Sequence, residues 1–162
     1  MREKYRDASD AVRDLESKIS DIDKRIAADY GPDMRFEALS RECIEFTPGG
    51  EWNYEICPFR DAKQKGKDGY PSTSIGTWEG FEEGGYGVMK FTNGQSCWNG
   101  PMRSLTVTLS CAEANKILSV DEPEVCKYAM RFQTPAACTA EHATEAQADL
   151  NALSGGSGHD EL

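Results

Sequence analysis

Arg103 and Tyr128 have side-chain types and positions that could form a binding site. Arg103 follows the Gly-Pro turn of CWNGPMRS and is in phase, counting by two, with the apolar residues of RSLTVTLSC. Tyr128 is in phase with Met130 and Phe132. An inward-facing guanidinium costs free energy unless it is paired or used. The pattern predicts either a site for a polyol, built from a planar donor fork and an amphipathic ring, or an Arg–Glu pair that closes a barrel end.

The sequence gives little support for catalysis. A Ser-His-Asp or Cys-His arrangement needs a histidine in the fold, but both histidines, at 142 and 159, lie near the C-terminus. A glycosidase-like carboxylate pair needs no histidine. However, no neighbouring motif singles out any of the candidate acids as catalytic, and solvation at the surface explains most of them. The candidates are Glu42, Glu45, Glu79, Glu82, Glu83, Glu122 and Glu124. The segment GFEEGGYGVMKF lacks the Lys-Ser/Thr of a phosphate loop and predicts a hairpin. We therefore predict that the chain is not an enzyme.

The cysteines predict three disulfides in an oxidising compartment. The even set contains no C-x-x-C pair, and the histidines lie far from any cysteine pair, so we expect neither a metal site nor a cofactor. The positions alone leave the connectivity open. The residues are Cys43, Cys57, Cys97, Cys111, Cys126 and Cys138.

Charge and the C-terminal residues indicate where the protein acts. With 18 basic and 28 acidic residues, the net charge of −10 argues against nucleic acid and anionic membranes as partners. The last four residues spell HDEL, an address that the retention receptor of the endoplasmic reticulum recognises: His159, Asp160, Glu161 and Leu162. We therefore predict the lumen of that compartment. Residues 1–30 lack the apolar core of a signal peptide, so we expect a piece of a longer precursor or a chain whose signal was removed.

Residues 1–30 predict a helix of coiled-coil character that ends at Gly31-Pro32. The apolar residues alternate at spacings of three and four, as in the a and d positions of a heptad: Tyr5, Ala8, Val12, Leu15, Ile19, Ile22 and Ile26. This stripe either packs on its own domain, or pairs with a helix of another chain or of a missing antiparallel segment.

Residues 42–138 predict a mainly β domain, joined to the helix by a connector at residues 31–41. Short alternating segments between Gly-rich turns are typical of a sandwich or flattened barrel; they are RECIEF, EWNYEICPF, SIGTWEGF, GVMKFTNGQSCW, RSLTVTLSC and VCKYAMRF. Residues 139–162 have little to bury and predict a disordered tail with transient helix over 143–153, which would keep the HDEL accessible.

Six short segments, in order, resemble the mannose-6-phosphate receptor homology (MRH) lectin domain of the glucosidase II beta subunit family. They are NYEICPF, AKQK, STSIGTW, CWNGPMRS, DEPEVCKYAM and TPAAC. The resemblance covers roughly residues 30–138, and the HDEL terminus fits it. It implies a flattened β-barrel of two antiparallel sheets. It also implies the disulfides Cys43–Cys57, Cys97–Cys126 and Cys111–Cys138.

The resemblance further implies which residues bind mannose. By motif these are Gln64 in AKQK, Arg103 in GPMRS, Glu122 in DEPEVC and Tyr128 in CKY, with Trp98 at the pocket edge. Glu124 is the competing acid, but Glu122 fits the spacing Glu-Pro-x-x-Cys-x-Tyr. We expect Arg103 and Glu122 to neutralise each other before sugar binds. The phosphate-binding features of the receptors are not evident.

The function that the resemblance implies is that of a non-catalytic lectin subunit. It would hold mannose on N-glycans and present glucosylated glycoproteins to a catalytic alpha subunit, in N-glycan processing and quality control. The implied partners are mannose-containing N-glycans, the alpha subunit, contacted through parts outside this sequence, and the HDEL receptor. A stand-alone lectin of the glycoprotein degradation pathway and a coiled-coil scaffold are the alternatives.

Overall fold

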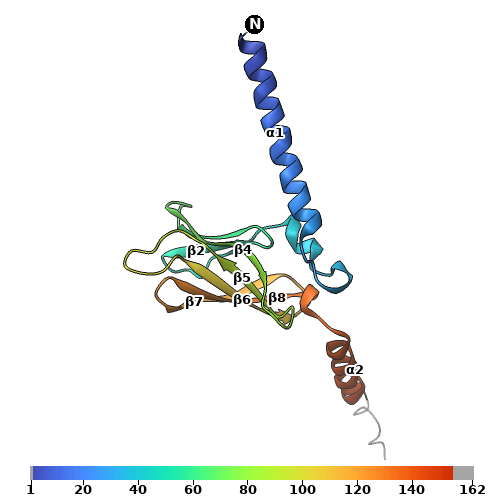
Figure 1. Cartoon of the computed structure of the whole chain (residues 1–162). Coiled ribbons are helices and arrows are strands. Elements are labelled where there is room, and N and C mark those ends of the chain that lie inside the picture. The colour runs from blue at the N-terminus through green and yellow to red at the C-terminus, as the bar shows by residue number, and fades with distance from the viewer. Residues whose placement is uncertain (1, 155–162) are drawn as a thin grey trace, which may run out of the picture. The chain divides into compact units, whose positions relative to one another are not determined.

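The computed structural model describes residues 2–154 of the 162-residue chain. The chain divides into two compact units, residues 1–30 and residues 31–162. Figure 1 shows the long helix α1, Arg2–Ala27, and the strands of the second unit. The predicted N-terminal helix is confirmed, and it ends ahead of Gly31-Pro32.

None of the residues of α1 is buried. Its heptad stripe is exposed, and more than half of the surface is accessible at Tyr5, Val12, Leu15, Ile19, Ile22 and Ile26. An apolar stripe of this kind gains free energy when another helix covers it. Pairing of α1 with a further helix therefore stays a prediction.

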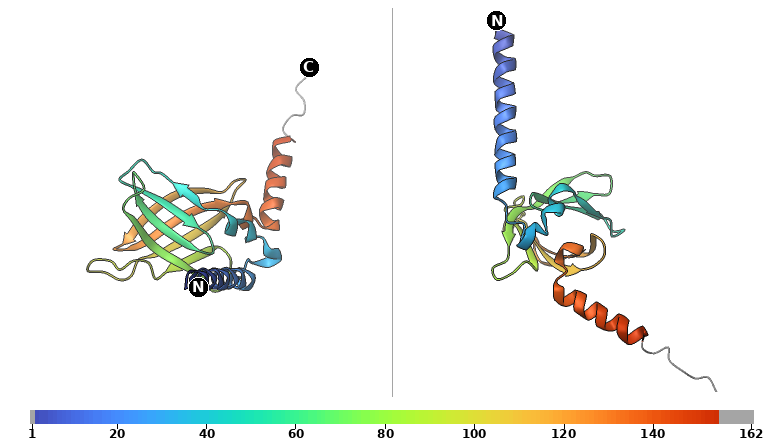
Figure 2. Two further views of the ribbon diagram at one scale, coloured as in Figure 1. Left: turned by 90° about the horizontal axis from the view of Figure 1, so that it is seen from above. Right: turned by 90° about the vertical axis from the view of Figure 1, so that its right-hand side faces the viewer.

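Eight strands form one strongly curved sheet, with the spatial order β1-β2-β3-β4-β5-β6-β8-β7. Their bounds are Ile44–Phe46, Trp52–Cys57, Asp61–Gly66, Ser72–Phe81, Val88–Thr92, Ser104–Cys111, Lys116–Glu124 and Lys127–Thr134, for β1 to β8 in chain order. The sheet curls until β1 and β7 approach each other, which gives a nearly closed, flattened barrel (Figure 2). The predicted fold class is confirmed. One pair departs from antiparallel order: β6 and β8 are parallel, because β7 lies outside β8.

Two strands that the alternation did not predict are β3 and β7. Strand β3 reads DAKQKG, in which Ala62 is the only apolar side chain, so no period-2 apolar signal exists. Strand β7 pairs only with β8 in the described sheet and contains Pro123. Proline has no backbone N–H to donate, and an edge strand tolerates it because one side of that strand has no partner strand. These two strands carry Gln64 and Glu122.

The core lies inside the curled sheet. The predicted alternation of β6 and β8 is confirmed, because their in-phase apolar residues are buried. The 3-10 helices Pro32–Met34 and Glu37–Arg41 also contribute, so residues 31–41 pack on the barrel as well as connecting it to α1. A third 3-10 helix, Pro135–Ala137, follows β8. The main core side chains are Phe36, Leu39, Ile56, Ile75, Met89, Phe91, Leu105, Val107, Met130 and Phe132.

Three disulfides join the pairs that the resemblance implied. Cys43–Cys57 links the start of β1 to the end of β2, Cys97–Cys126 links the loop before β6 to the start of β8, and Cys111–Cys138 links the end of β6 to the segment after β8. Each bond restricts the unfolded chain and stabilises the fold, by about 2–4 kcal/mol for a typical disulfide.

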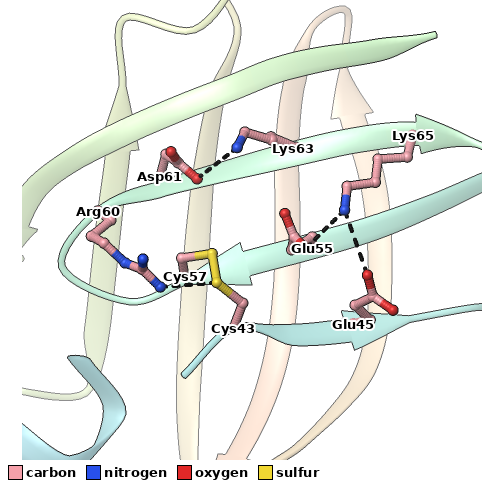
Figure 3. The surroundings of a disulfide bond; sticks show 8 residues. All are labelled: Cys43, Glu45, Glu55, Cys57, Arg60, Asp61, Lys63 and Lys65. Carbon is pink, nitrogen blue, oxygen red and sulfur yellow. Dashed lines mark hydrogen bonds and ion pairs between the residues drawn. A yellow bond between two sulfur atoms is a disulfide. The ribbon is translucent and has the colours of Figure 1, made fainter. Parts of the chain in front are cut away.

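The first disulfide lies beside a charged cluster on β1 to β3 (Figure 3). Lys65 Nζ binds Glu55 Oε2 at 2.7 Å and Glu45 Oε1 at 3.5 Å, while Arg60 Nη2 donates to Cys43 Sγ at 2.9 Å. The hydrogen bond that Lys65 donates to Glu55 is the main cause of the raised pKa of Lys65. Because side chains alternate along a strand, this cluster lies on the face of β3 opposite Gln64 and fixes that strand against β2.

The C-terminal segment, for which we expected a tail with transient helix over 143–153, contains a helix of slightly greater length. Residues Ala140–Ser154 form helix α2, with exposed side chains over 140–153. The segment is rich in Ala and also contains Glu and Leu, all residues of high helix propensity. The HDEL residues 159–162 lie outside the described residues. No described helix is long and apolar enough to cross a membrane, and among residues 2–154 no group of His, Cys, Asp or Glu is placed to hold a metal ion.

Replacing Phe91 by Ala should destabilise the barrel by about 3–5 kcal/mol, because the ring is fully buried and its loss leaves a cavity. The control is Ile19→Ala, whose side chain is 58% exposed on α1. Urea unfolding followed by tryptophan fluorescence measures both. Equal effects of the two substitutions would contradict this account of the core.

Candidate functional site

Tyr128 is the centre of the candidate site. It is the second residue of β8 and is only 5% exposed. The parallel pairing of β6 with β8 sets Leu105 opposite Tyr128, so the residue just before β6, Arg103, lies near the start of β8. The disulfide Cys97–Cys126 anchors the same place. The ends of two strands and one loop therefore converge at the Tyr128 hydroxyl.

Gln64 reaches this hydroxyl from β3. The Tyr128 Oη donates to Gln64 Oε1 at 3.4 Å. The other end of the amide, Gln64 Nε2, donates to Tyr54 Oη, also at 3.4 Å. Tyr54 is paired with Gln64 across β2 and β3, in phase with the buried Ile56 and Ala62, so both side chains lie on the inner face of the sheet.

Arg103 is half-buried and is held by its own loop. Its Nη1 donates to the backbone oxygens of Ser96 at 2.9 Å and Gln95 at 3.3 Å. Its positive charge acts on the Tyr128 phenol. The Arg103 Nε is shielded from solvent and has no hydrogen-bond partner among the described residues. Leaving a buried donor unpaired costs about 1–3 kcal/mol, so this atom favours a ligand that brings an acceptor.

Glu122 lies on β7 and is exposed, and its charge acts on Tyr128. Its Oε1 accepts a 2.6 Å hydrogen bond from the Cys126 backbone N. The expected ion pair between Arg103 and Glu122 does not form among the described residues: the guanidinium binds loop carbonyls and the carboxylate binds a backbone amide. The competing acid, Glu124, forms an exposed ion pair with Lys127 at 2.6 Å.

The remaining predicted residue, Trp98, follows Cys97 in the loop between β5 and β6 and is 89% exposed. The structure thus brings Gln64, Arg103 and Glu122 to Tyr128, and leaves Trp98 as an exposed ring on the loop that the disulfide ties to β8. Such a ring can cover an apolar face of a ligand.

Tyr128 keeps its proton. Burial is the main cause of a raised pKa at this phenol, and the Glu122 charge raises the pKa further, while the hydrogen bond and charge of Arg103 act in the opposite direction. The hydroxyl can therefore accept from Arg103 and donate to Gln64 at the same time.

Sequence reasoning missed Tyr54. Its ring centre lies 6.5 Å from that of Tyr128, and its hydroxyl accepts from Gln64. The available signal was its place in NYEICPF, two residues before the buried Ile56, which sets it on the inner face. Together the site offers a guanidinium, an amide, a carboxylate and two phenols at one end of the barrel, a set that can bind several neighbouring hydroxyl groups.

Comparison with protein families matches residues 1–156 to the family described as glucosidase II beta subunit-like protein. The glucosidase 2 subunit beta of Oryza sativa subsp. indica is 40% identical over 162 residues, all of this chain and 26% of the relative. The human protein of that name is 41% identical over 118 residues, 71% of this chain and 22% of the relative. The chain therefore spans about a quarter of the length of these relatives.

Solved structures give the same picture. The MRH domain of glucosidase II beta bound to mannose aligns with a TM-score of 0.53 and 33% identity, covering 63% of this chain and 98% of that one. A tryptophan-to-alanine mutant of the GBII-beta MRH domain aligns with a TM-score of 0.50 and 34% identity, covering 60% and 94%. The MRH domain of Yos9, complexed with alpha3,alpha6-Man5, shares the fold at 21% identity, with a TM-score of 0.52 and coverage of 67% and 84%.

A methyl group at Gly94 should displace the loop that holds Arg103. A Cβ there would lie 2.7 Å from the Arg103 backbone oxygen and 2.8 Å from that of Ser74. We expect Gly94→Ala to destabilise the domain by about 1–3 kcal/mol in urea unfolding. Gly87→Ala is the control, because a Cβ there meets nothing within 4 Å. If the two variants unfold alike, the close approach at Gly94 is not as described.

Alkaline pH should destabilise the fold through Tyr128. The folded chain holds this phenolic proton more tightly than the unfolded chain does, since its pKa is raised from the ordinary 10.0. The resulting stability is fully present below about pH 10 and is lost as the pH rises through the folded pKa. The free energy of unfolding should therefore fall more between about pH 9.5 and about pH 11.5 in the wild type than in Tyr128→Phe. An identical fall in both would refute the shift.

Proposed function

Because the chain belongs to the glucosidase II beta subunit-like family, we propose that it is a non-catalytic lectin subunit that binds mannose on N-glycans. Residues 42–138 are the lectin domain in this proposal. The binding residues are Gln64, Arg103, Glu122 and Tyr128, with Trp98 at the edge.

The observation that carries the proposal is the Arg103 guanidinium with its unpaired Nε, next to Tyr128 and Gln64. A buried donor without a partner is costly, and a ligand oxygen that reaches it recovers that cost. Arginine presents its donors in a planar fork, which suits two neighbouring oxygen atoms.

Mannose differs from glucose in its axial 2-hydroxyl group, and the site has the groups to detect this difference. Arg103 donates, and the Gln64 amide both donates and accepts, so together they bind the axial oxygen. Glu122 accepts from the 3- and 4-hydroxyls, and Tyr128 acts at the same edge. A sugar that places its hydroxyl elsewhere leaves these polar groups unpaired, and this loss is the source of the selectivity.

The affinity for one sugar should be weak, with a Kd from millimolar to tens of micromolar, because a monosaccharide has few atoms to bind. Weak binding is sufficient when the lectin is tethered to an enzyme, since tethering raises the effective concentration. We therefore propose that the domain presents glucosylated glycoproteins to a catalytic alpha subunit, bound through parts outside this sequence, in N-glycan processing and quality control.

The HDEL residues support a location in the endoplasmic reticulum lumen, with retention by the HDEL receptor. In this role the chain supplies both the glycan contact and the retention address for the enzyme. The disulfides agree with an oxidising compartment.

Arg103→Ala should abolish mannose binding and leave the fold intact. The measurement is calorimetry with mannose, with glucose as the epimer control, and surface plasmon resonance on an immobilised high-mannose glycan. Arg131→Ala is the matched control, because Arg131 is exposed on β8 away from Tyr128 and should bind as the wild type does.

The circular dichroism spectra of the wild type and both variants should agree, which separates a lost contact from a lost fold. Full glycan binding by a folded Arg103→Ala chain, or equal affinity of the wild type for glucose and mannose, would reject the site.

A further inference from the structure

We propose that Tyr54 is a positioning residue of this site, which holds the Gln64 amide in one orientation for the bound sugar. The inference rests on the proposed function, because it names a further residue of the same site. Tyr54 lies on β2 and is paired with Gln64 on β3. Its hydroxyl accepts from Gln64 Nε2 at 3.4 Å.

The Arg103 charge acts on Tyr128 and favours a phenol whose oxygen, rather than its hydrogen, faces the guanidinium, because a guanidinium can only donate. The protonated Tyr128 hydroxyl then donates its own hydrogen, and the acceptor that it meets is Gln64 Oε1. The amide oxygen of Gln64 therefore faces Tyr128.

The amide nitrogen then faces Tyr54. One hydrogen of the Gln64 NH₂ group is directed to the Tyr54 oxygen, and the other hydrogen stays available as a donor. The Gln64 oxygen keeps one lone pair besides the one that receives the Tyr128 hydrogen. The amide can therefore offer a sugar hydroxyl one donor and one acceptor, in fixed places.

The opposite orientation of the amide conflicts with its neighbours. It would direct the NH₂ group at the Tyr128 hydroxyl and would remove the acceptor that the Tyr128 hydrogen has in the observed orientation. The two ends of a Gln amide have nearly the same shape, so the hydrogen bonds at each end decide its orientation. The Tyr54 hydroxyl supplies the bond at the second end.

The hydrogen bonds of the Gln64 amide contribute little to the stability of the fold. Both hydrogen bonds of the amide are 3.4 Å long, at the weak end of the range. The Tyr54 ring packs at 6.5 Å from the Tyr128 ring, and a phenylalanine keeps that contact. Tyr54→Phe therefore removes the hydroxyl while it preserves the packing, which makes it a clean test.

The experiment compares the wild type, Tyr54→Phe and the control Tyr70→Phe, whose side chain is 85% exposed. Calorimetry with mannose should show a Kd about three- to tenfold higher for Tyr54→Phe and unchanged for Tyr70→Phe. Urea unfolding should give the same stability for all three chains. A Kd for Tyr54→Phe equal to that of the wild type would overturn the inference.

The side-chain amide signals of Gln64 in a ¹⁵N–¹H spectrum report the hydrogen bonding of this amide directly, and no ligand is needed. In the wild type and Tyr70→Phe, one amide hydrogen should be shifted downfield by its bond to Tyr54, and Tyr54→Phe should lose that shift. Unchanged Gln64 signals in Tyr54→Phe would also overturn the inference. If the signals change but the wild type binds no mannose, the positioning is correct and the proposed function is wrong.

Discussion

The hydrogen bond from the buried Tyr128 phenol to Gln64, with the Arg103 charge acting on the same phenol, is the interaction on which the site depends. A donor-only group beside a protonated phenol fixes which way every neighbouring hydrogen points. Gln64 accepts from the phenol, and the Glu122 charge helps to keep the phenol protonated. Four residues from four parts of the chain thereby form one polar end of an otherwise apolar barrel.

Strand pairing and a disulfide hold the residues of this site in place. The parallel pairing of β6 and β8 puts the loop before β6 next to the start of β8, and the disulfide Cys97–Cys126 fixes that proximity. Strand β3 is fixed from the other side by the ion pairs of Lys65 with Glu55 and Glu45 (Figure 3). The binding groups thus lie on paired strands and on a loop held by a disulfide. Less conformational entropy is then lost when a ligand binds, which favours even a weak ligand.

The sequence predicted the strands with clear alternation, such as β6 and β8, and the inward phase of Tyr128, because burial of one sheet face imposes a period of two. It did not predict β3, because the lysines of this strand leave no alternation of apolar and polar residues. The pairing of Tyr54 with Gln64 was therefore not predicted either. The expected Arg103–Glu122 ion pair was wrong, since the partners of both side chains are backbone groups that no residue pattern reveals. The resemblance, rather than the periodicity, supplied Gln64, Glu122 and the disulfide pairing.

The most direct test of the central claim is a crystal structure of this chain with mannose. Our account predicts the sugar at the open end of the barrel, with its 2-hydroxyl oxygen within hydrogen-bonding distance of Arg103 and Gln64 and its ring beside Tyr128. Mannose bound elsewhere, for example over the charged face of β1 to β3, with the Tyr128 end unchanged at saturating sugar, would contradict it.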